Sequence, residues 1–130
     1  MITIMTHRIV SFGALLITLG IVLGAFGAHG LKDVLTPEMR IIYEKAVFYH
    51  LLNAVGVLFV GIAGHLNLIS ARTSFSAALL LLTGILIFCG SLYLLSITGV
   101  RMFGAITPIG GVMFILAWGI VTWGAWCRRC

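Results

Sequence analysis

The fold is decided by the stretch Phe75–Val100, which reads FSAALLLLTGILIFCGSLYLLSITGV and contains no charged residue. An α-helix rises about 1.5 Å per residue, so about 20 apolar residues cross the ~30 Å hydrocarbon core of a bilayer. Three further stretches have a similar length and character: Ile9–Ala28, Ala46–Gly64 and Met102–Trp126. We therefore predict an all-α, polytopic membrane protein that forms an antiparallel bundle of four transmembrane helices.

The composition is typical of a membrane protein. Hydrophobic residues make up 62% of the 130 residues and charged residues 8%, whereas soluble domains carry about 25% charged residues. The mean hydropathy is +1.22. We predict a single domain over residues 1–130, with helices over about 9–28, 37–64, 75–98 and 106–126.

The basic residues stand at helix ends and in connections rather than on one face. Residues in these positions anchor a protein to lipid headgroups, so the net charge of +5 does not indicate nucleic-acid binding. The basic residues divide evenly between the two sides of a four-span topology, and the Arg128-Arg129 tail favours cytoplasmic termini. The first apolar run is too long for the core of a signal peptide, so we expect a retained helix.

Most charged residues lie in the segment Leu31–Lys45, which follows the first helix. We expect a short interfacial segment here, between helices 1 and 2. Within it, Thr36-Pro37-Glu38 is typical of a helix start, because Thr caps, Pro fits the first helical position and Glu complements the helix dipole. A helix from Pro37 to Gly64 is longer than the bilayer core is thick, so its first turns should stand in the interface.

Pro108 leaves two interpretations of the last span. In one, Thr107 caps a helix whose first residue is Pro108, and Arg101–Ile106 forms an interfacial loop. In the other, the helix begins near Met102 and Pro108 kinks it. We predict the first arrangement.

Two groups of small residues predict close helix packing. Gly20, Gly24 and Ala28 recur every four residues and lie on one face of helix 1, as in a GxxxG motif. In helix 3, Gly90 and Ser91 belong to a small, polar face that also favours packing.

Polar residues gather where helix 1 ends and helix 2 begins. Side chains such as His50 and Asn53, one to two turns inside an apolar run, are costly unless paired and suggest a function. We predict a shallow ligand pocket at this mouth, formed by His29, Tyr43, Glu44, Lys45, His50 and Asn53. Hydrogen bonding between helices is the more common role of such His and Asn side chains, and it stays open beside the pocket.

The sequence gives little support for a metal, a cofactor or catalysis. Helices 3 and 4 contain no histidine, which argues against a multi-haem cytochrome, and a zinc site needs three or four ligands. Cys127 and Cys130 form a Cys-Arg-Arg-Cys pair at the C-terminus, and Cys89 stands alone in an apolar helix. With three acids in the chain and no phosphate loop or nucleophile motif, we expect neither an enzyme nor a bound cofactor.

Four motifs in this chain resemble those of the domain-of-unknown-function 423 family. They are Gly24–Leu31 (GAFGAHGL), Tyr49–Ala54 (YHLLNA), Gly90–Leu95 (GSLYLL) and Thr107–Gly111 (TPIGG). The family comprises small bacterial inner-membrane proteins, the YgdD/YwdK-like group, and is related to animal transmembrane protein 256. The resemblance implies four helices in a bacterial cytoplasmic membrane and supplies no catalytic residue.

Three functions remain open at this point. The first is a non-enzymatic protein that binds a lipid, a small solute or a partner helix at the mouth of helices 1 and 2. The second is a minimal transporter or channel that self-associates, through Gly20 and Gly24, because four short helices seldom enclose a pathway. The third is a membrane redox protein. The expected partners are membrane lipids, a second copy or another membrane protein.

Overall fold

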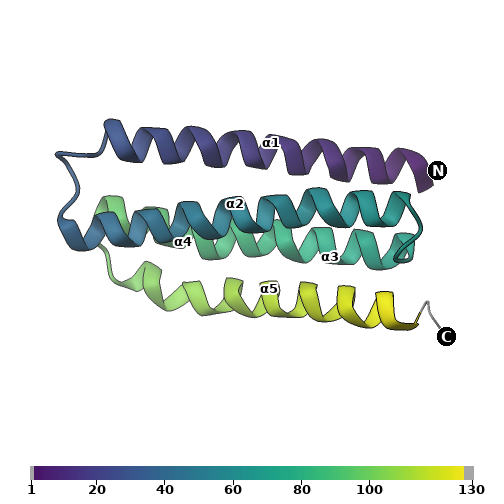
Figure 1. Ribbon diagram of the computed structural model, residues 1–130. Helices are drawn as coiled ribbons and strands as arrows, with labels where there is room; N and C mark the ends of the chain where they lie inside the picture. The colour runs from purple at the N-terminus through teal and green to yellow at the C-terminus, as the bar shows by residue number, and fades with distance from the viewer. Residues whose placement is uncertain (1, 128–130) are drawn as a thin grey trace.

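The structure is a computed structural model that describes residues 2–127, and it consists of four helical rods that run alternately in opposite directions (Figure 1). The third rod is continuous but contains three segments, α3, η1 and α4. The elements are α1 (Ile2–His29), α2 (Pro37–His65), α3 (Ala71–Gly84), η1 (Ile85–Cys89), α4 (Gly90–Thr98) and α5 (Met102–Cys127). All four rods are long and apolar enough to cross a membrane. The predicted all-α bundle of four membrane-spanning helices is confirmed.

Side-chain caps set the starts of α2 and α3. The Thr36 hydroxyl accepts a hydrogen bond from the Met39 N–H (3.3 Å), with Pro37 as the first helical residue, so this predicted helix start is confirmed. The Ser70 hydroxyl accepts from the Thr73 N–H (3.0 Å). This second cap starts the third rod at Ala71, earlier than the predicted start at residue 75.

The predicted cap at Thr107 is wrong. Helix α5 begins at Met102 and contains Pro108, so the segment predicted as an interfacial loop is helical from Met102 onward. The Thr107 hydroxyl is engaged instead with the Ser91 hydroxyl of the third rod, 2.8 Å away. Pro108 lacks an N–H and crowds the carbonyl four residues earlier, which here belongs to Gly104. Helix α1 likewise extends beyond its prediction and begins at Ile2 rather than Ile9.

The third rod contains one π-helical turn, η1, where α5 approaches it closely. A Cβ added at Gly110 of α5 would lie 2.5 Å from the backbone nitrogen of Phe88 in this turn. The glycine therefore allows the two backbones to touch. At its far end the rod ends at Thr98, and Gly99 forms the C-cap, with a left-handed φ of 70° and an N–H that donates to the Leu95 carbonyl oxygen at 2.8 Å.

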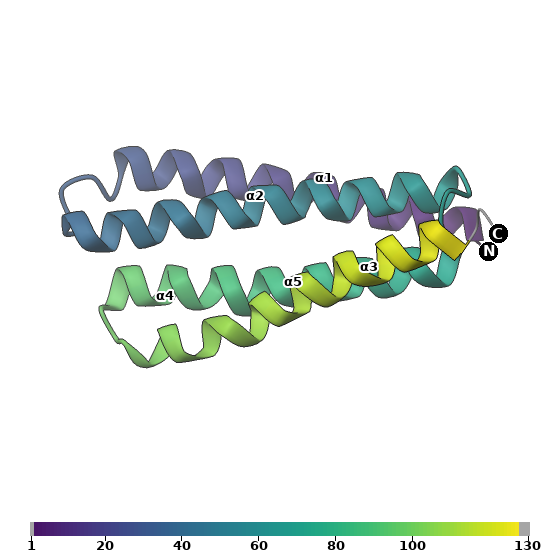
Figure 2. The ribbon, with the colours of Figure 1, turned by 60° about the horizontal axis from the view of Figure 1, so that its bottom comes forward.

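The rods are ordered α1, α2, third rod, α5, so that two are central and two are outer (Figure 2). Half of the most apolar window of α2 is buried, against 17% for both α1 and α5. The main core lies between α2, the third rod and α5, and it includes Ala54, Val57, Leu81, Phe114 and Ala117. Helix α1 packs chiefly on α2 and makes its main contact with the third rod at α3.

Candidate functional site in the first two helices

His50 joins three helical rods from the middle of α2. Its Nε2 lies 3.0 Å from the Leu16 carbonyl oxygen of α1, and its Nδ1 lies 3.2 Å from the Tyr93 hydroxyl of α4. A carbonyl oxygen only accepts, so we assign the proton to Nε2, which donates to Leu16. Nδ1 then accepts a hydrogen bond from the Tyr93 hydroxyl. Both ring nitrogens are thus used in holding the bundle together.

Tyr43 makes a second polar connection from α2 to α1. Its hydroxyl donates to the Leu23 carbonyl oxygen at 2.7 Å, and its ring lies 5.2 Å from the Tyr93 ring, centroid to centroid. Asn53 is also buried but does not reach α1 in the same way. Its amide donates to the Tyr49 carbonyl oxygen, one turn earlier in α2, at 2.9 Å.

Glycines of α1 make room for these side chains. A Cβ at Gly20 would lie 2.7 Å from the Leu51 side chain and 3.3 Å from the His50 ring, and a Cβ at Gly27 would overlap the Tyr43 ring. Together with Gly13, these buried glycines recur every seven residues and face α2. This heptad spacing is visible in the sequence and predicts the face of α1 that packs on α2.

The small residues predicted to allow close helix packing occupy different environments. Gly20 faces α2, and a Cβ at Gly24 would lie 3.2 Å from Val47, whereas Ala28 is exposed. A Cβ at Gly90 would meet no atom within 4 Å. Ser91 is buried and bonds both the Phe88 carbonyl and the Thr107 hydroxyl.

The remaining candidates for the pocket lie on the surface. His29, Glu44 and Lys45 are exposed, and Glu44 forms an ion pair with Arg40 at 3.6 Å, one turn away. The structure therefore brings Tyr43 and His50 together around Tyr93 but leaves these three residues outside the cluster. The buried donors of Tyr43, His50 and Asn53 are directed at backbone carbonyls.

The cysteines and histidines do not converge on a metal centre within residues 2–127, where no group of three or more potential ligands occurs. Cys89 is buried in the core, and Cys127 is exposed at the end of α5. Arg128, Arg129 and Cys130 lie outside the described residues, and so does the proposed Cys-Arg-Arg-Cys pair. His7 and His65 face each other with ring centroids 5.3 Å apart.

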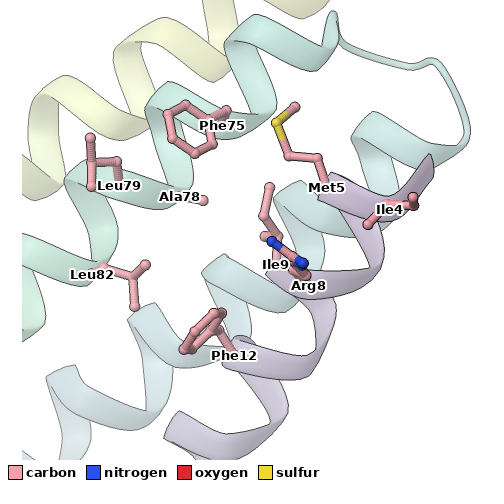
Figure 3. A pocket seen from close by; sticks show the side chains of 9 residues that line it. All are labelled: Ile4, Met5, Arg8, Ile9, Phe12, Phe75, Ala78, Leu79 and Leu82. Atoms are coloured by element: carbon pink, nitrogen blue, oxygen red, sulfur yellow. The ribbon is translucent and has the colours of Figure 1, made fainter. Parts of the chain in front are cut away.

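A groove between α1 and α3 was not anticipated from the sequence (Figure 3). It has a volume of about 350 Å³ and lies at the end of the bundle where both helices begin. Its lining is apolar except for one arginine, and consists of Ile4, Met5, Arg8, Ile9, Phe12, Phe75, Ala78, Leu79 and Leu82. The only hint in the sequence was the position of Arg8 directly before an apolar run.

These features define a small, multi-pass helical-bundle membrane protein. The family described as "Protein of unknown function (DUF423)" matches residues 23–111, and the chain belongs to this family. A UPF0382 membrane protein of Staphylococcus epidermidis is 48% identical over 109 residues, which cover 82% of this chain and 84% of that protein. The UPF0382 membrane protein YwdK of Bacillus subtilis is 42% identical over 107 residues, with 82% and 85% covered. No solved structure matches the chain.

Proposed function

We propose that this protein is a non-enzymatic lipid-binding protein of the bacterial cytoplasmic membrane, with both termini on the cytoplasmic side. The observation that carries the proposal is the groove between α1 and α3. Its volume of about 350 Å³ falls within the range of about 300–1,000 Å³ typical of ligand sites. The site proposed here differs from the mouth of helices 1 and 2, because Tyr43, His50 and Asn53 use their donors on backbone carbonyls.

The groove is open on the outer side of the bundle. Phe12 of α1 is 55% exposed, and Phe75 and Leu79 of α3 are 48% and 50% exposed, although all three line the groove. A molecule can therefore enter sideways from the surrounding lipid. The lining from Ile4 to Phe12 extends for about 12 Å along α1.

The chemistry of the lining favours an acyl chain over a polar solute. Sites for small polar molecules place several polar groups around the ligand to fix its orientation. Here Arg8 is the only charged residue, and the other lining residues are aliphatic, aromatic or methionine. An acyl chain needs only an apolar surface of matching shape.

The structure gives the channel alternative no comparable support. Self-association was expected to use Gly20 and Gly24, but both face α2 within the same chain. That surface is thus already occupied in the single bundle. We propose lipids as the main partners.

Filling the groove tests the proposal. Leu79→Trp places a larger side chain at a half-exposed position of the groove, and we expect it to reduce the phospholipid retained after detergent extraction, measured by native mass spectrometry. The matched control is Leu86→Trp, because Leu86 lies in the same rod, is 72% exposed and does not line the groove. Equal retention in the two variants would contradict the proposed site.

A further inference from the structure

Arg8 lies where the groove passes from the interface into hydrocarbon. It directly precedes the uncharged run Ile9–Ala28, whose length of ~30 Å as a helix equals the thickness of the bilayer core. A charged side chain at this depth lies at the level of the lipid phosphates. Figure 3 shows Arg8 among the apolar side chains that line the groove.

The charged side chains of the described residues at this end of the bundle are basic. All three acidic residues of the chain, Asp33, Glu38 and Glu44, lie in the α1–α2 connection or at the start of α2, at the opposite end. Arg72, in the first turn of α3, is basic and exposed. The guanidinium of Arg8 therefore has no acidic side chain near it to compensate its charge.

We infer that the groove selects a glycerophospholipid with a net negative headgroup. The phosphate binds the Arg8 guanidinium, whose fork of N–H donors matches phosphate oxygens. One acyl chain lies along the apolar wall formed by Ile9, Phe12 and Leu82. This inference rests on the proposed function and adds the class of ligand and the residue that recognises it.

A lipid accounts for the whole lining better than a free anion does. A free phosphate would use Arg8 alone and leave the groove's apolar surface unused. A lipid joins both parts, because its phosphate and its acyl chain are held at the same relative depth as Arg8 and Phe12. One phospholipid molecule therefore matches both the apolar groove and the charge of Arg8.

The test measures which lipid the purified full-length protein takes up. The protein is equilibrated with vesicles of equal parts phosphatidylglycerol and phosphatidylcholine with matched acyl chains, and bound lipid is identified by native mass spectrometry. One arginine near the membrane surface predicts about fivefold enrichment of phosphatidylglycerol. We expect Arg8→Gln to remove this enrichment while the total amount of bound lipid stays similar, and Arg8→Lys to retain most of it.

Arg72→Gln is the matched control, because Arg72 lies at the same end of the bundle but does not line the groove. Unchanged enrichment in Arg72→Gln together with its loss in Arg8→Gln supports the inference. Enrichment that survives Arg8→Gln, or that falls equally in both variants, overturns it. Failure of the proposed function looks different, because the wild-type protein would then retain no lipid or Leu79→Trp would retain as much as the wild type.

Discussion

Helix α1 meets its two neighbours in opposite ways. Toward α2 its backbone comes so close that a Cβ at Gly13 would lie 2.6 Å from the backbone nitrogen of Leu58, and two polar side chains of α2 bond its carbonyls. Toward α3 large side chains such as Phe12 and Leu79 stand apart around a groove. The same helix thus has one tightly packed face and one open face.

The difference shows what holds helices together in lipid. Lipid tails are as apolar as leucine, so burial of apolar side chains gives little drive for association, and close packing and hydrogen bonds take its place. The α1–α2 contact has both, supplied by glycines and by Tyr43 and His50. Along the groove, the side chains of α1 and α3 leave a space of about 350 Å³ between the helices, which we propose that lipid fills.

The largest effect is expected from blocking the backbone contact between α1 and α2. Gly13→Val would place a branched side chain against backbone atoms of Leu58, which cannot move aside as a flexible side chain does. We expect a loss of about 3 kcal/mol in the free energy of unfolding, measured in mixed detergent micelles. Gly119→Val is the control, because a Cβ at Gly119 meets nothing within 4 Å. A similar loss in both variants would show that the close approach is not what matters.

A smaller effect is expected from the polar connection at His50. His50→Leu removes the bonds to Leu16 and Tyr93 and leaves the Tyr93 hydroxyl without this partner, so we expect a loss of about 1 kcal/mol. A double-mutant cycle with Tyr93→Phe, measured by the same unfolding assay, should give a coupling of about 0.6 kcal/mol, the average for such bonds in membranes. Strictly additive losses would mean that the two side chains do not stabilise each other.

The smallest effect is expected in the groove. Leu79→Ala removes most of a side chain that is 50% exposed, and lipid can fill the space it leaves. The free energy of unfolding should therefore change by less than about 0.5 kcal/mol. Leu81→Ala, two positions along the same helix but fully buried, serves as the positive control and should cost clearly more, because it leaves a cavity among packed helices. A large loss for Leu79→Ala would mean that the α1–α3 side is as firmly packed as the core.

The candidate site was predicted in part. His50 and Asn53 were selected as polar residues inside an apolar helix, and Tyr43 as a polar residue near the start of the same helix. The structure shows which groups they bond. Their partners were not predictable, because Leu16, Leu23 and Tyr49 contribute backbone carbonyls that no side-chain pattern reveals. His29, Glu44 and Lys45 were grouped with them by sequence proximity, which does not show on which side of a helix a residue lies.

The sequence by itself determined that the protein lies in a lipid bilayer, how many helices cross it and where α2 begins. These properties depend on composition, on the length of apolar runs and on short-range capping by residues such as Thr36. Only the tertiary structure decided the groove beside Arg8, the helical course through Pro108 and the π-helical turn opposite Gly110. The physical reason is that lipid-facing and core-facing residues are both apolar, so the pattern of hydrophobicity does not reveal how each helix is rotated toward its neighbours.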